Sequence, residues 1–182
     1  MASIERVKLT YSLLTIATVV IYSFVIPQIG KLWPTVYFIV AECIKLGIIQ
    51  KLFYLDTSPV ENTKKRSNKL KNILVESIKF AILILLTTAS FAFICVVLGA
   101  PALHQFEETF ALSSLLTTLS LFPISLFVGV NSTMLILFTE SFVLVNVDSK
   151  AYLKDLKRNA FLVLFAAFCG SIVAPLDWDR PW

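Results

Sequence analysis

The chain has 182 residues, of which 57% are hydrophobic and 15% charged, and its formal net charge is +4. This composition, with a mean hydropathy of +0.81, excludes an ordinary soluble domain and is typical of a multi-pass membrane protein. In such a chain the basic residues set orientation, so the net charge does not argue for a nucleic-acid partner. We predict one all-α membrane domain, residues 1–182, built as a bundle of about five transmembrane helices and one interfacial helix.

The first two predicted spans are residues 10–26 and 33–54. No small-x-small cleavage site follows the first, so we interpret it as a retained span and not as a signal peptide. Glu42 and Lys45 lie three positions apart in the second span and therefore share a helix face. A charge at mid-bilayer costs about 2.5–3.5 kcal/mol. The two residues are predicted to form a structural ion pair between helices, with a lipid-headgroup or proton-handling role as the alternative.

Residues 56–72 form the one strongly polar stretch of any length, within the predicted loop 55–78. Its basic residues are Lys64, Lys65, Arg66, Lys69 and Lys71. We interpret this stretch as a cytosolic loop that sets orientation, while a patch for nucleic acid or anionic lipid is the alternative.

Three further spans are predicted at residues 79–99, 109–130 and 159–176. Pro123 lies inside the second of these and is expected to kink it, which neighbouring helices in a bundle tolerate. The 18 residues of the last span cover roughly 27 Å and suit a thin membrane such as that of the endoplasmic reticulum.

Residues 131–158 are predicted to be an interfacial segment. Their apolar run, residues 134–147, is too short to span a bilayer. Polar positions recur about every seven residues, at Thr133, Glu140 and residues 146–148, as on an amphipathic helix that lies flat on the membrane.

The distribution of Lys and Arg predicts the orientation. With a cytosolic N-terminus, eleven of the 16 Lys and Arg residues fall in cytosolic segments and only Lys31 and Arg180 in the opposite ones. The turn at residues 100–108 and the tail at residues 177–182 are then lumenal. The glycosylation sequon that begins at Asn131 is cytosolic and should stay unmodified.

The chain ends in the stretch Ala-Pro-Leu-Asp-Trp-Asp-Arg-Pro-Trp, residues 174–182. Its two prolines impose an extended or turn conformation. Asp177 and Asp179 flank Trp178, and Arg180 is close enough to pair with either carboxylate. The stretch is either an aromatic belt with a surface ion pair or a rigid recognition loop at the membrane face.

We find no motif of an autonomous enzyme. The single histidine, His104, has no cysteine or histidine at metal-ligand spacing, so a zinc site is not expected. The three cysteines lie far apart in apolar runs and do not suggest disulfides. Small residues four apart in the last span, Ala166 with Gly170 and Ala167 with Ser171, allow another helix to approach closely, either within the bundle or in a partner.

Three features together resemble the phosphatidylinositol-glycan biosynthesis class F family, PIG-F. Gly99-Ala100-Pro101 is followed by Glu108-Thr109-Phe110, as the family's G-A-P turn is followed by an E-T-F helix start. Residues 175–182 are similar to its P-L-D-W-[DE]-R-P-W loop, which is the most specific of the three. The order of spans, with a basic loop between the second and third, is the last.

The family's loop is followed by a Q-x-W-P continuation and a final span, whereas this chain stops at Trp182. We therefore expect a fragment, a short isoform, or a form without the last span.

The resemblance implies a multi-pass protein of the endoplasmic reticulum membrane that acts in the assembly of glycosylphosphatidylinositol (GPI) anchors. It implies an accessory, non-catalytic subunit that stabilises a large multi-pass ethanolamine phosphate transferase of the PIG-O or PIG-G type. That enzyme moves ethanolamine phosphate from phosphatidylethanolamine to an anchor mannose, with its metal in the large subunit. For this chain we therefore expect no cofactor, metal site or catalytic residue.

We expect two lumenal segments to form one surface that contacts the partner or lipid. Its residues are Gly99, Pro101, Glu108, Thr109, Phe110, Asp177, Trp178, Asp179, Arg180, Pro181 and Trp182. One alternative is a catalytic or co-catalytic phosphotransferase in which Glu107, Glu108, Asp177 and Asp179 touch the phospholipid headgroup. The other is a small lipid transporter built around Glu42 and Lys45.

Overall fold

The computed structural model describes residues 2–25, 33–55, 69–99, 106–138, 144 and 146–173. Within these ranges the chain is all-α, as predicted. Its six helices are α1 (Ala2–Val25), α2 (Trp33–Phe53), α3 (Lys69–Val97), α4 (Phe106–Val128), α5 (Val130–Phe138) and α6 (Val147–Val173).

Three of these helices are long and apolar enough to cross a membrane. The qualifying segments are Ile4–Phe24 of α1, Leu74–Val97 of α3 and Phe106–Val128 of α4, which match the first, third and fourth predicted spans. Helices α2 and α6 are also long, but charged residues interrupt their apolar sequence. The described part of the chain therefore contains three candidate spans where the sequence predicts about five.

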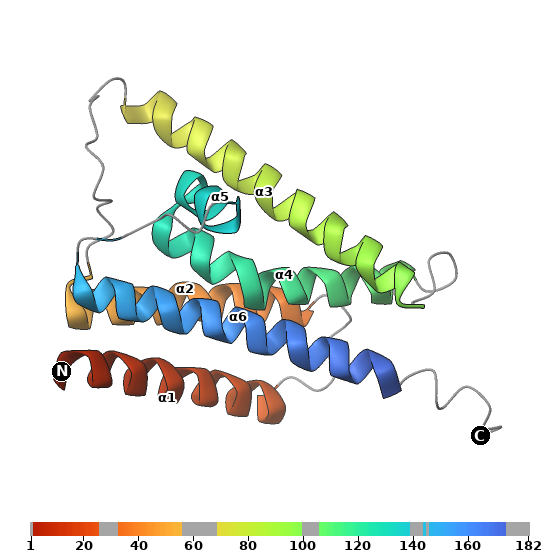
Figure 1. Ribbon diagram of the computed structural model, residues 1–182, viewed down its shortest axis with the longest axis horizontal. Helices are drawn as coiled ribbons and strands as arrows, with labels where there is room; N and C mark the ends of the chain where they lie inside the picture. The colour runs from red at the N-terminus through yellow and green to blue at the C-terminus, as the bar shows by residue number, and fades with distance from the viewer. Residues whose placement is uncertain are drawn as a thin grey trace.

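Helix α4 is the centre of the bundle. It packs against α2, α3, α5 and α6, while α1 packs on α2 and α6 (Figure 1). Of the apolar window of α4, 61% is buried inside the protein, against 11% in α1 and 17% in α3. Helices α1 and α3 therefore present most of their apolar surface outward, as helices in contact with lipid do.

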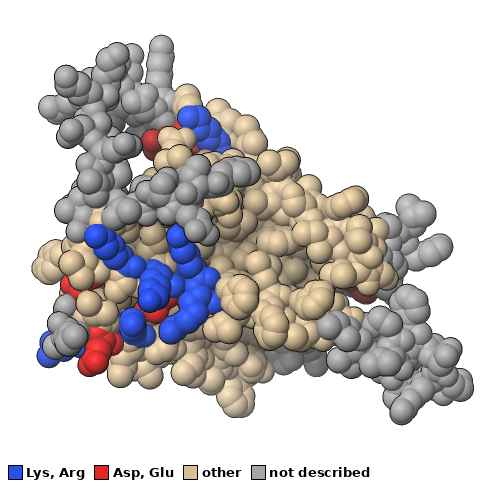
Figure 2. All heavy atoms as spheres, in the orientation of Figure 1, with Lys and Arg blue, Asp and Glu red and all other residues tan. Residues whose placement is uncertain are grey.

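The long helices run alternately in opposite directions. In Figure 1, α1 begins at the end of the bundle where α2 stops, and α3 and α6 begin at that same end. The opposite end holds the last turns of α1, α3 and α6 and the first turns of α2 and α4. We call the former the basic end, because Figure 2 shows most of the visible Lys and Arg side chains gathered there.

Helix α6 extends well beyond the span predicted from the sequence. It begins at Val147 and continues through residue 159, where the sequence analysis separates an interfacial segment from the last span. Its first half has one buried face with side chains of mixed polarity. These residues are Ser149, Tyr152, Leu153, Leu156 and Ala160, and their spacing of three and four is that of a helix.

Helix α3 likewise begins earlier than predicted, at Lys69, so the end of the basic stretch 55–78 is helical. Pro123 lies in the interior of α4, which is assigned as one helix across it.

A break at Gly129 separates α4 from α5. Gly129 has a φ of +82°, a conformation that side chains with a Cβ atom rarely adopt. Thr133 is fully buried, although the sequence analysis places it on the polar outer face of a flat helix. The burial is tolerated because its Oγ1 donates to the carbonyl oxygen of Gly129 at 2.8 Å, which satisfies the hydroxyl with the residue that precedes its helix.

Hydroxyl groups join α4 to its neighbours. Thr35 Oγ1 in α2 lies 3.0 Å from Ser114 Oγ, and Thr88 Oγ1 in α3 donates to Thr117 Oγ1 at 3.1 Å. Such bonds between small polar residues are a usual way for membrane helices to associate. These two bonds connect α2 and α3 to positions one turn apart on the central helix.

Candidate functional site

A buried charged cluster lies between α1, α2 and α6. The Nζ atom of Lys45 is 2.5 Å from Oε1 of Glu42, and the two side chains are only 3% and 4% exposed. Both residues belong to α2, so the ion pair joins two side chains one turn apart on the same helix. Enclosure by protein still removes the cost of facing lipid with a bare charge.

A chain of aromatic rings connects this ion pair to the other helices. The Nζ atom of Lys45 lies 5.4 Å from the centroid of the Tyr11 ring in α1, within the range of a cation–π contact. Tyr11 meets Tyr152 of α6 edge-on, with ring centroids 5.7 Å apart. Tyr152 also meets Phe127 of α4 edge-on at 4.8 Å. The chain of contacts therefore links α2, α1, α6 and α4 in turn.

A second ion pair lies on α6, between Asp155 and Arg158. Asp155 is 3% exposed and its Oδ1 atom lies 3.2 Å from Nη2 of Arg158, whose side chain is 66% exposed. Among the residues that the structure describes, the Oδ2 atom of Asp155 and the hydroxyl of Tyr11 have no hydrogen-bond partner. Buried polar atoms of this kind are uncommon and mark a place where bound water or a further group would be stabilised.

This geometry bears on the two roles considered for Glu42 and Lys45. A headgroup or a transported lipid must reach the charges, but in this conformation the pair is enclosed on α2 by α1 and α6. The arrangement suits a structural ion pair that positions three helices. In the described part of the chain, no group of three His, Cys, Asp or Glu residues could hold a metal ion.

The predicted lumenal surface is only partly within the described residues. Gly99 follows α3 with a φ of +104°, and Glu108, Thr109 and Phe110 lie in the first turns of α4. Both lie at the end of the bundle opposite the basic end (Figure 1). Glu108 and Phe110 are exposed, whereas Thr109 is buried. Pro101 and residues 177–182 lie outside the described residues.

Two aromatic rings extend this exposed surface along α4. Phe106 and Phe110 stack with centroids 6.1 Å apart, and both side chains are exposed. Glu107 and Glu108 stand beside them in the first turn, where carboxylates interact favourably with the helix dipole. The result is an exposed patch that is both aromatic and acidic.

One of the two small-residue pairs of the last predicted span, Ala166 with Gly170, lies on the outside of the bundle, whereas Ala167 and Ser171 are half-buried. Ala166 and Gly170 are exposed, and a Cβ atom built on Gly170 would meet no other atom within 4 Å. Among the described residues no helix uses this face for packing.

Sequence reasoning missed the aromatic and acidic residues of the buried cluster. Tyr11, Tyr152 and Asp155 attract no attention by type, since each lies in an apolar or basic segment. The available signal is the spacing of Ser149, Tyr152 and Leu156 at intervals of three and four, which predicts a buried helix face inside the basic segment.

Comparison with known proteins gives a consistent set of matches. A family model described as "GPI biosynthesis protein family Pig-F" matches residues 6–182. The human protein "GPI ethanolamine phosphate transferase, stabilizing subunit" is 28% identical over 144 residues, which cover 77% of this chain and 63% of the human protein.

A protein of Schizosaccharomyces pombe, "PIGF/3-ketodihydrosphingosine reductase fusion protein", is 28% identical over 91 residues, which cover 50% of this chain and 17% of that protein. The chain thus spans less than two thirds of the length of both curated relatives. No solved structure matches it.

Proposed function

Because the chain belongs to the Pig-F family of GPI biosynthesis proteins, we propose that it is a non-catalytic, stabilising subunit of a GPI ethanolamine phosphate transferase. The observation that carries this proposal is the family match, which extends over residues 6–182. The human relative, a stabilizing subunit of that transferase by name, supports the same role.

The proposed partner is a large multi-pass subunit of the PIG-O or PIG-G type. That subunit would carry the metal and transfer ethanolamine phosphate from phosphatidylethanolamine to an anchor mannose. This chain would contribute contact surface to the complex and no catalytic group. Membrane lipids are its other proposed neighbours.

We place this subunit in the endoplasmic reticulum membrane, with about five spans and a cytosolic N-terminus. The alternating directions of α1, α2, α3, α4 and α6 support five crossings (Figure 1). The gathering of basic side chains at one end supports the orientation, since that end is then cytosolic (Figure 2). Exposed members of the basic group include Lys150, Lys154, Lys157 and Arg158.

The proposed contact surface for the partner is lumenal. It combines the turn Gly99–Thr109 with the loop Asp177–Trp182. The last turns of α3 and α6 and the first turn of α4 lie at the same end of the bundle, so the helices that lead to both segments converge there (Figure 1). The exposed pair Phe106 and Phe110 adds apolar area of the kind that dominates protein contacts.

Within the loop we assign two kinds of role. Asp177 and Arg180 would pair and fix the shape of the loop. Trp178 and Trp182 would be the anchors that a partner buries, because large aromatic residues carry much of the binding energy of an interface.

The experiment compares partner levels in cells that depend on this chain. Trp178→Ala and Arg180→Ala should each lower the abundance of the large subunit while the chain itself inserts normally. Lys154→Ala, which changes an exposed residue at the opposite end, serves as the control. Normal large-subunit levels in both loop variants would contradict the assigned surface.

A second measurement tests the pathway itself. The chain is expressed in cells that lack their own family member, and surface GPI-anchored proteins are scored by flow cytometry. Restored staining is the expected result. Unchanged staining, with the chain present in the membrane and bound to the large subunit, would contradict a stabilising role for these 182 residues.

A further inference from the structure

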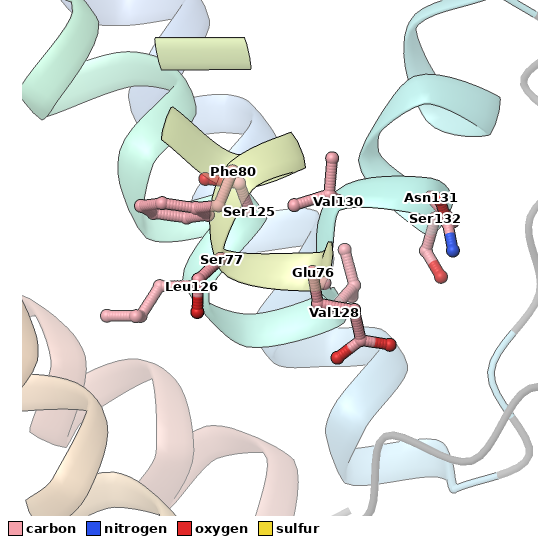
Figure 3. Close-up of a pocket in the computed structure, with 10 residues that line it drawn as sticks. Glu76, Ser77, Phe80, Ser125, Leu126, Val128, Val130, Asn131 and Ser132 are labelled. Atoms are coloured by element: carbon pink, nitrogen blue, oxygen red, sulfur yellow. The ribbon is translucent and has the colours of Figure 1, made fainter. Parts of the chain in front are cut away.

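The basic end of the bundle carries two surfaces of opposite charge. The first is a groove of about 460 Å³ between α3, the end of α4 and α5, and Glu76 is the charged residue among its described lining residues (Figure 3). The second is the exposed face of the first half of α6, where Lys and Arg side chains gather (Figure 2). A carboxylate repels an anionic group and ammonium groups attract it, so an anion favours the second surface.

Three lysines form one stripe on this face of α6. Lys150, Lys154 and Lys157 are exposed and lie four and three positions apart, so their side chains project from the same side of the helix. The opposite side is the buried face that contains Tyr152 and Leu156. We call the three residues the lysine stripe.

The lysine stripe has little negative charge beside it on its own helix. Asp155 is the one carboxylate between positions 149 and 160, and it is 3% exposed and paired with Arg158. Like charges one turn apart on a helix repel each other and destabilise the helix slightly. An anion held between the lysines would remove this repulsion.

The same face of α6 becomes apolar one turn after the lysine stripe. Phe161 and Phe165 follow Lys157 at intervals of four, stack with centroids 6.2 Å apart, and are 67% and 56% exposed. Phe168 continues this line and is 50% exposed. We call these three residues the phenylalanine row. It begins about 6 Å along the helix axis from the last lysine, so charged and apolar surfaces adjoin on one face, as they do in a phospholipid.

The change from charge to apolar surface marks a membrane boundary in the proposed topology, in which the basic end is cytosolic. Residues 159–173 contain no Asp, Glu, Lys or Arg, whereas the lysine stripe covers about 10 Å of helix immediately before them. Basic residues at this position attract the anionic lipids of the cytosolic leaflet. An acidic protein segment would match the lysines but not the phenylalanines that follow them on the same face.

We propose that the lysine stripe and the phenylalanine row bind one anionic phospholipid of the cytosolic leaflet. The ammonium groups of Lys154 and Lys157 contact its phosphate, and Lys150 contacts the outer part of its headgroup. One acyl chain lies on the stacked rings of the phenylalanine row. The site rests on the proposed membrane orientation, but it uses no residue of the proposed lumenal surface and needs no transferase subunit.

The test is native mass spectrometry of the purified full chain, released at low salt from micelles that contain defined lipids. The probes are phosphatidylserine, phosphatidylglycerol and phosphatidylcholine at equal concentration. The chain should retain the two anionic lipids in preference to phosphatidylcholine. Lys154→Gln with Lys157→Gln should lower their retention about thirtyfold, since each basic residue near a membrane surface contributes a factor of about five.

Arg6→Gln with Lys8→Gln is the matched control. This pair removes the same charge from two exposed residues at the same end of the bundle, but the residues lie on α1 and outside the lysine stripe. The control should retain anionic lipid like the unmodified chain. The thermal midpoint of each variant is measured in parallel, so that a lost lipid is distinguished from a lost fold.

A phosphatidylserine with a photoreactive diazirine in its acyl chain tests the phenylalanine row. After irradiation and digestion with trypsin, the label should appear on the peptide that follows Arg158. The variant with Lys154→Gln and Lys157→Gln should lose this label. Labelling of α3, which exposes apolar surface elsewhere on the bundle, should be equal in the two proteins.

The outcomes separate the possible ligands. Equal retention of phosphatidylcholine and the anionic lipids would overturn the proposal, as would equal losses in the two double variants. Binding of soluble glycerophosphoserine without retention of any lipid would overturn the lipid assignment. Protection of the lysine stripe from acetylation by the large subunit, with no anionic lipid retained, would replace the lipid with an acidic protein surface. Because the lipid measurements use the chain without a partner, a negative result there leaves the proposed stabilising role intact.

Discussion

The ammonium group of Lys45 lies over the ring of Tyr11, 5.4 Å from its centroid, while the same group pairs with Glu42. This contact joins α2 to α1 through a charge that is almost completely enclosed by protein. Enclosed charges stabilise a fold only while every partner is in place, because an uncompensated buried charge is costly. The consequences of breaking this arrangement are therefore large and specific.

Lys45→Met should destabilise the chain by about 3–5 kcal/mol, because it leaves the Glu42 carboxylate buried without a counter-charge. The double change Glu42→Gln with Lys45→Met should be less damaging than Lys45→Met alone. The measurement is the free energy of unfolding by SDS titration in mixed micelles. Lys154→Met, an exposed position on α6, is the control. A Lys45→Met variant as stable as this control would contradict the role of the pair.

Tyr152→Ala should cost about 3–5 kcal/mol, the usual loss when a fully enclosed aromatic ring is removed. Tyr152 is 2% exposed and touches the rings of both Tyr11 and Phe127. Tyr152→Phe keeps those contacts and should remain close to the unmodified chain. Phe161→Ala, which removes a ring that is 67% exposed, is the matched control in the same unfolding assay. Equal losses at positions 152 and 161 would show that the ring contacts do not stabilise the bundle.

The hydrogen bond between Thr88 and Thr117 should contribute a coupling energy of about 0.6 kcal/mol, the average for such bonds between membrane helices. The measurement is a double-mutant cycle with Thr88→Val and Thr117→Val. Thr87 gives the control cycle, because its hydroxyl bonds only to backbone oxygens of α3, at Leu83 and Ile84. A coupling for Thr87 with Thr117 as large as that for Thr88 would refute the assignment.

Gly129→Ala should destabilise the chain by about 1–2 kcal/mol, because a side chain is strained at positive φ. No atom lies within 4 Å of the added Cβ atom, so the cost is one of backbone conformation alone. Gly47→Ala in α2 meets equally open space without positive φ, and it should raise stability by up to about 1 kcal/mol. The unfolding free energies of the two variants should therefore change in opposite directions.

Much of the fold could be predicted, because the hydropathy of a long segment is set by that segment's own residues and not by the helices that pack against it. The candidate spans in α1, α3 and α4 follow from runs of apolar residues alone. The unbroken helix α6 could not be found in this way. The exposed Lys150 and Lys154 give this segment the pattern of a polar surface segment. The helix is stabilised instead through Tyr152 and Leu156, which are buried against helices that come earlier in the chain.

The candidate sites likewise include residues that the sequence alone identifies and contacts that depend on how the helices pack. Glu42 and Lys45 stand out in the sequence because charges are expensive within an apolar helix. Their contact with Tyr11 does not stand out, since it depends on how α1 packs against α2 and α6. The groove between α3 and α5 was also not predicted, because it exists only where the break at Gly129 turns α5 toward α3.

The hydroxyl groups of α4 bear on how the chain enters the bilayer. Ser113, Thr117 and Ser120 each donate to a carbonyl oxygen one turn earlier in the same helix, at 2.6–2.9 Å. Their hydrogen bonds are therefore complete before any other helix arrives. A newly made α4 can leave the translocon and remain in lipid as a single helix, although in the folded bundle it is the most enclosed of the three candidate spans. Helices α2 and α3 then dock onto a helix in which these three hydroxyl donors are already satisfied.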